Sequence, residues 1–166
     1  MATSKKNSPK RAKRNVRKTS KKSAIKKSLS LVPSTLRDAT IQQNTTLDTL
    51  YVVNDSTGNI TLEVNAGAEG QTSDMTIKLD DKIIAQNLAG DFPETVIGTN
   101  KKLNGQKLTI VATIADTSQE TNLTSLTIHL KGGVGHADFP LSKTVDDEGA
   151  SVDYLCLIEF FDPNNQ

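Results

Sequence analysis

Several residue types that build common functional sites are scarce in this 166-residue chain. Tryptophan is absent and aromatic residues make up only 4% of the chain, which disfavours a large aromatic-lined pocket. The single cysteine, Cys156, excludes a disulfide within one chain and is typical of a reducing compartment. Because Cys156 lies within the apolar run at residues 154–161, we expect a buried structural thiol and not a nucleophile.

Long apolar runs are also missing. Residues 1–27 contain no apolar run of about 7–15 residues, so we expect no secretory signal. No stretch approaches the ~20 apolar residues of a membrane-spanning helix. These absences predict a cytoplasmic or nuclear protein, or a virion protein if the source is a virus.

Acidic residues are missing from residues 1–37, and this absence divides the chain. Residues 1–37 carry thirteen basic side chains, including every arginine, and no Asp or Glu. Residues 38–166 carry the other seven lysines and all nineteen acidic residues, a formal charge of −12. The net charge of +1 therefore conceals a separation of +13 from −12. We define residues 1–37 as the basic arm, 38–46 as a polar linker and 47–166 as the acidic domain.

The basic arm has too few apolar residues to offset the entropy of ordering it, so we expect it to be disordered when free. Dense positive charge attracts phosphates, and arginine adds bidentate phosphate contacts. The arm has no aromatic residue on which bases could stack, which argues against a dedicated single-strand reader. We therefore predict non-specific binding of DNA or RNA through twelve residues: Lys5, Lys6, Lys10, Arg11, Lys13, Arg14, Arg17, Lys18, Lys21, Lys22, Lys26 and Lys27.

Two short patterns in the arm agree with nucleic-acid binding. Residues 8–11 read Ser-Pro-Lys-Arg and look like the Ser-Pro-basic-basic units of histone tails, and residues 9–14 are similar to a short nuclear-import signal. The alternatives are a solubilising spacer, an anionic membrane surface, or an acidic protein surface such as the acidic domain of another copy. Of these, a membrane partner is the least favoured.

From residue 47 the apolar residues follow a two-residue period, which is typical of strands. We expect no helix after residue 40 and a flexible connection at the glycine-rich residues 132–135. The run at 152–161 is apolar enough for the centre of a sheet. The pattern predicts an antiparallel β-sandwich, immunoglobulin-like or jelly-roll, with the topology left open. Its seven or eight strands are expected at residues 47–53 and 59–65, as a hairpin, and at 75–79, 82–85, 95–97, 107–115, 123–130 and 152–161.

Three residues form a minimal set of metal ligands. His129 and His136 are the only histidines, and Asp138 follows the second of them by two positions. Two imidazoles and a carboxylate suffice to hold a transition metal if they converge. His129 is expected on a strand and His136 in a loop, so the sequence does not establish that they meet. Ordinary surface or core histidines are the favoured interpretation, and we predict no metal site.

Catalytic motifs are missing as well. The glycines at 132–135 lack the Gly-Lys-Ser/Thr ending of a phosphate-binding loop, and no Gly-x-Ser-x-Gly elbow occurs. Carboxylates at 80–81 and 146–148 could hold Ca²⁺, but turn solvation is the commoner reason for such clusters. We therefore predict no catalytic residue, no cofactor and no enzymatic activity.

The combined features predict a structural or assembly protein. The arm would bind nucleic acid, while the acidic domain, which repels nucleic acid, would associate with itself or another protein. This layout resembles that of small viral coat proteins, although no motif is shared, and a chromatin- or ribosome-associated protein fits the same observations. The alternative is a protein-interaction β-sandwich, such as an adaptor, inhibitor or appendage subunit, with the arm as a spacer.

Overall fold

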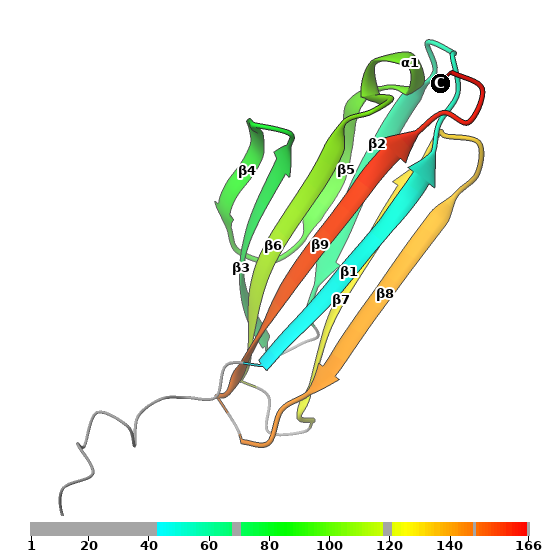
Figure 1. Cartoon of the computed structure of the whole chain (residues 1–166). Coiled ribbons are helices and arrows are strands. Elements are labelled where there is room, and N and C mark those ends of the chain that lie inside the picture. The colour runs from blue at the N-terminus through cyan, green and yellow to red at the C-terminus, as the bar shows by residue number, and fades with distance from the viewer. Residues whose placement is uncertain (1–42, 68–70, 118–120, 148, 166) are drawn as a thin grey trace, which may run out of the picture. The chain divides into compact units, whose positions relative to one another are not determined.

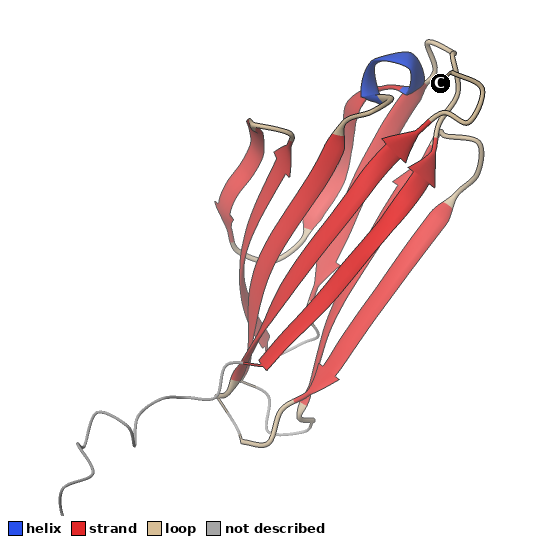
Figure 2. Cartoon of the chain, in the orientation of Figure 1, coloured by secondary structure: helices blue, strands red, loops and turns tan. Residues whose placement is uncertain are grey.

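The computed structural model describes residues 43–67, 71–117, 121–147 and 149–165. This part of the chain is all-β, as predicted, and its strands form two sheets (Figures 1 and 2). A single helical turn, α1 (Asn100–Leu103), interrupts the strands, where none was expected. The strands are β1 (Gln43–Val52), β2 (Asn59–Ala66), β3 (Gln71–Leu79), β4 (Lys82–Leu88), β5 (Phe92–Thr99), β6 (Lys107–Asp116), β7 (Leu123–Lys131), β8 (Ala137–Thr144) and β9 (Ser151–Phe161).

The five-stranded sheet has the order β1-β9-β6-β3-β4, and the four-stranded sheet has the order β5-β2-β7-β8. All neighbouring strands are antiparallel except β1 and β9, which run parallel, so the prediction of a purely antiparallel fold is wrong for this pair. The expected hairpin of residues 47–53 with 59–65 is also wrong. β1 and β2 lie in different sheets, because the turn at residues 55–58 leads the chain from one sheet to the other instead of folding it back within one.

The inward-facing residues of both sheets form one buried cluster. Burial follows the two-residue period because successive strand residues point to opposite faces. β9 lies between β1 and β6, which agrees with the interior position expected from its apolar sequence. Cys156 on β9 is fully buried, as predicted, and burial raises the pKa of its thiol to about 12. The fully buried side chains of β9 are those of Val152, Tyr154, Cys156, Ile158 and Phe160.

Two segments that the sequence analysis assigned to irregular structure are strands. Residues 43–46, assigned to the linker, form the start of β1. β8 was missed because Pro140 and the glycines before it favour a loop. β8 tolerates a proline because it is an edge strand, where a missing N–H need not break a ladder hydrogen bond. The pairing of β8 with β7 decides the geometry of the candidate site.

Candidate functional site

The twelve basic residues predicted to bind nucleic acid, from Lys5 to Lys27, all lie outside the described residues. Their role in binding therefore stays a prediction. Within the described part of the chain, no helix is long and apolar enough to cross a membrane. The chemically distinctive cluster that the structure does describe lies on the four-stranded sheet.

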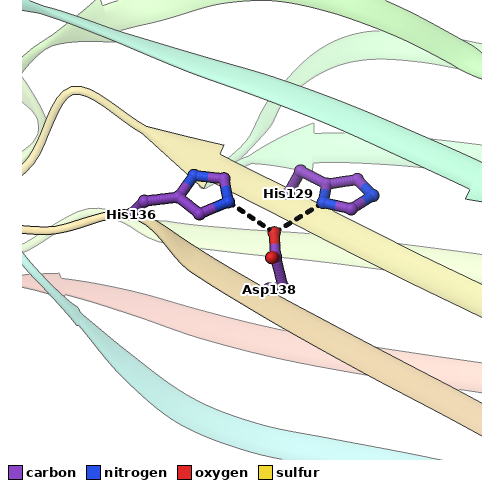
Figure 3. Close-up of side chains that lie close together, drawn as sticks. All are labelled: His129, His136 and Asp138. Carbon is purple, nitrogen blue, oxygen red and sulfur yellow. Dashed lines mark hydrogen bonds and ion pairs between the residues drawn. The ribbon is translucent and has the colours of Figure 1, made fainter.

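Figure 3 shows that His129, His136 and Asp138 point toward one another. His129 Nδ1 lies 2.6 Å from Asp138 Oδ1, and His136 Nε2 lies 2.8 Å from the same oxygen. The two imidazole rings are stacked, with centroids 6.5 Å apart and planes 15° from parallel. One ligand atom from each of the three residues lies within 4.8 Å of the others. The structure thus brings together three residues whose convergence the sequence left open.

The register of two strands creates this cluster. β7 and β8 are antiparallel, and His129 lies directly opposite Asp138 in that pair. Side chains at directly opposed positions have Cβ atoms about 4.5–5.5 Å apart. His136 precedes Asp138 by two positions, and the two-residue period of a strand puts both on one face. The pairing register of β8 with β7 is the signal that would have located the site, and Pro140 concealed that strand in the sequence.

The loop that leads to His136 is fastened to β1 by a tyrosine. The Tyr51 hydroxyl donates a hydrogen bond to the Gly135 carbonyl oxygen at 2.6 Å, and the Gly133 N–H donates to the Tyr51 hydroxyl at 3.0 Å. Tyr51 is buried, and this burial raises the pKa of its hydroxyl, which keeps the hydroxyl protonated and able to donate. The position of His136 therefore depends on a side chain from the opposite sheet.

The same loop is also held at its first glycine. The Asn100 side-chain amide donates to the Gly132 carbonyl oxygen at 2.8 Å, and Asn100 is itself buried. Gly132 has a φ of +93°, and a Cβ atom there would lie 2.0 Å from the Asn59 carbonyl oxygen. Only glycine fits such a position. Residues 132–135, expected to form a flexible connection, are thus tied to the domain by specific hydrogen bonds.

Charged neighbours surround the cluster on the same sheet. The hydrogen bond with His129 is the main reason that the pKa of Asp138 is lowered, and the hydrogen bond with His136 adds to it. Lys131 forms ion pairs with Glu94 at 2.8 Å and with Glu63 at 3.8 Å. The three carboxylates of Glu63, Glu94 and Asp138 lie near the single ammonium group of Lys131, so the fixed charges of this face favour a cation.

The cluster is open to solvent. The side chain of His129 is 23% exposed, that of Asp138 is 49% exposed and that of His136 is 50% exposed. Solvent therefore reaches all three side chains. The cluster can accept an ion or a hydrogen-bonding group from solvent.

Asp80, in one of the acidic loops considered for Ca²⁺, has a role in the local structure. Asp80 occupies the turn between β3 and β4, as predicted, and its Oδ1 accepts a hydrogen bond from the Lys107 N–H at 2.9 Å. Within the described ranges, the histidine–aspartate cluster is the only group of three or more such ligands close enough to hold a metal ion. Asp80, Asp81, Asp146 and Asp147 form no such group with other described residues.

Comparison with known proteins gives no relative. No protein-family model, curated protein or solved structure matches this chain. The functional evidence therefore lies in the charges and contacts of the chain itself.

Proposed function

We propose that this protein is a non-enzymatic structural or assembly protein. In this proposal, the basic arm binds nucleic acid non-specifically and the acidic domain associates with itself or with another protein. The observation that carries the proposal is the separation of +13 in residues 1–37 from −12 in residues 38–166. Such a separation gives one chain a segment that attracts phosphate and a domain that repels it.

We infer that the acidic domain is a β-sandwich. Two sheets that contribute to a single buried cluster support this architecture. Sheets of five and four strands agree in number with a nine-stranded variable-type immunoglobulin sandwich better than with an eight-stranded jelly roll. The strand order differs from the immunoglobulin order, because β6, and not the eighth strand, lies between β9 and β3.

Exposed apolar side chains support protein association by the acidic domain. Leu50, Val111 and Leu155 are 55%, 44% and 39% exposed, and all three belong to the five-stranded sheet. Val111 and Leu155 are directly opposed on β6 and β9, so their side chains adjoin on the outer face of that sheet. Contiguous apolar surface marks sites that bind protein, and in this proposal the pair contributes to such a surface.

The arm's role is tested by measuring the affinity of the full chain for a labelled DNA duplex and a labelled RNA by fluorescence anisotropy. If about 6–10 phosphates are neutralised, affinity should fall roughly 10³–10⁵-fold between about 50 and 200 mM salt. The matched control is a chain of unchanged length in which the twelve basic residues from Lys5 to Lys27 are replaced by serine. Equal affinity of the two chains would refute a binding role of the arm.

The alternative function, a protein-interaction module with the arm as a spacer, is supported by the same apolar side chains. It predicts that removal of residues 1–37 leaves binding to a protein partner unchanged. Under the assembly proposal, the same deletion abolishes nucleic-acid binding while the β-domain stays folded. Circular dichroism of the shortened chain verifies the fold in both cases.

A further inference from the structure

We propose that His129, His136 and Asp138 form a binding site for one divalent transition-metal ion, with Zn²⁺ as the best-suited ion. The site lies on the acidic domain and is independent of the proposed role of the arm. Two imidazole nitrogens select first-row transition metals over Ca²⁺ and Mg²⁺, which prefer ligand sets made of oxygen. Three protein ligands leave a fourth position of a tetrahedral ion for water or for a group from a partner.

The distances suit an ion of this size. Zn²⁺ binds histidine nitrogen and carboxylate oxygen at about 2.0–2.2 Å, so two ligand atoms of one tetrahedral ion are roughly 3.3 Å apart. Without an ion, Asp138 Oδ1 lies 2.6 Å from His129 Nδ1 and 2.8 Å from His136 Nε2, and the ligand atoms of the three residues all lie within 4.8 Å of one another. The change needed is therefore about 0.5–0.7 Å for the two hydrogen-bonded pairs and at most about 1.5 Å for the third pair. Rotation of the half-exposed side chains of His136 and Asp138 can supply it.

A hydrogen-bonding partner is already present behind one ligand. His129 Nε2 lies 3.2 Å from the side-chain amide nitrogen of Asn65 on β2. When a metal ion occupies Nδ1, the proton of a neutral imidazole resides on Nε2. The Asn65 amide can then present its oxygen to that N–H. Outer partners of this kind orient metal-ligating histidines and raise the affinity of the site.

The supporting structure holds the ligands in place before an ion binds. His129 and Asp138 lie on paired strands, and the loop before His136 is fastened by the two hydrogen bonds of the Tyr51 hydroxyl. Ligands on such supported elements lose less conformational freedom when they bind an ion. Tyr51 is thus a positioning residue for the proposed site.

The rest of the chain offers little competition for such an ion. His129 and His136 are the only histidines, and residues 1–37 contain no His, Cys, Asp or Glu. The remaining thiol, Cys156, is buried. A change in a histidine ring signal on addition of zinc would therefore report on this cluster alone.

The test titrates the full chain, freed of nucleic acid in high salt, with ZnCl₂. Isothermal titration calorimetry measures affinity and stoichiometry, and long-range ¹H–¹⁵N NMR spectra follow the histidine rings. We expect one ion per chain and changes in the signals of both rings. His136→Ala and Asp138→Asn should each weaken binding by at least about tenfold, because loss of an outer partner alone typically costs 10–100-fold.

The matched control is Asp48→Asn, which removes an exposed carboxylate from β1 in the other sheet and should leave zinc affinity unchanged. Ring signals of the wild-type chain that do not respond to zinc would overturn the proposal. Equal zinc affinity of His136→Ala and the wild type would overturn it as well. His136 is half exposed and lies in a loop, so circular dichroism and thermal melting should show an intact fold for this variant.

Discussion

Replacement of Tyr51 by phenylalanine should loosen the loop at residues 132–135 while leaving the core packed. The substitution removes only the hydroxyl, which donates to Gly135 and accepts from Gly133. The ring remains, with its edge-to-face contact to Phe160 at a centroid distance of 5.9 Å. The expected loss of stability therefore comes only from the two lost hydrogen bonds and from the Gly133 N–H and Gly135 carbonyl groups that lose their partner.

The magnitude follows from those two bonds. A typical neutral hydrogen bond contributes about 0.5–1.5 kcal/mol net, and a buried group left without a partner costs about 1–3 kcal/mol. Because the loop is part-buried and water can reach some of its groups, we expect Tyr51→Phe to lower the free energy of unfolding by about 1–3 kcal/mol. Urea denaturation followed by circular dichroism measures this difference as a shift of the midpoint at constant slope.

Tyr154→Phe is the matched control. The Tyr154 hydroxyl is hydrogen-bonded to Thr124 Oγ1 at 2.8 Å in the buried core, away from the glycine loop. Its loss should also destabilise the domain, but the NMR signals of the His136 ring and the zinc affinity should stay as in the wild type. Tyr51→Phe should change both. A Tyr51→Phe variant with wild-type stability and an unchanged His136 signal would refute the claim that this hydroxyl holds the loop.

Three further predictions concern other parts of the domain. A Cβ atom at Gly133 would lie 2.6 Å from a backbone carbonyl oxygen of β1, whereas one at Gly135 would meet open space. Gly133→Ala should therefore lower the free energy of unfolding by about 1–3 kcal/mol, and Gly135→Ala by less than about 0.5 kcal/mol. Equal urea midpoints of the two variants would contradict this prediction. Burial raises the pKa of the Cys156 thiol to about 12, so this thiol should not react with iodoacetamide at about pH 8 until urea unfolds the chain. Labelling of the native protein within minutes would contradict this prediction and show that β9 opens. The hydrogen bond from Lys131 lowers the pKa of Glu94, so the contribution of this ion pair to stability is complete above the usual pKa of 4.5 and is lost as the pH falls through the lowered pKa of the folded state. Glu94→Gln should therefore make the fall in the urea midpoint between about pH 5 and 3 slightly shallower. An identical pH profile of the variant and the wild type would contradict a stabilising ion pair.

The sequence predicted the strands whose apolar residues alternate cleanly, because the two-residue period depends only on which face is buried. It also indicated a turn at Asp80 and Asp81, where turn solvation was the favoured reason for the paired carboxylates, because short turns are encoded by neighbouring residues. It could not predict the pairing of β1 with β9, because a parallel pair joins segments more than 100 residues apart and leaves no local turn signal.

The candidate metal site shows the same limit. His129, His136 and Asp138 were identifiable as ligand types, but their convergence depends on the register of β7 with β8. β8 could not be recognised, because Pro140 disfavours a strand unless that strand lies at an edge, and edge position is a property of the folded sheet. The support that Tyr51 gives to the loop is equally non-local, since 82 positions separate Tyr51 from Gly133.

The most direct test of the proposed function is size-exclusion chromatography with light scattering and absorbance at 260 and 280 nm, applied to freshly purified full-length protein. At low salt, we predict a species that carries nucleic acid and exceeds the mass of one 17.9 kDa chain. High salt should release the nucleic acid, because the contacts are electrostatic. A nucleic-acid-free monomer at both salt concentrations would contradict the account and leave the protein-interaction module as the better explanation.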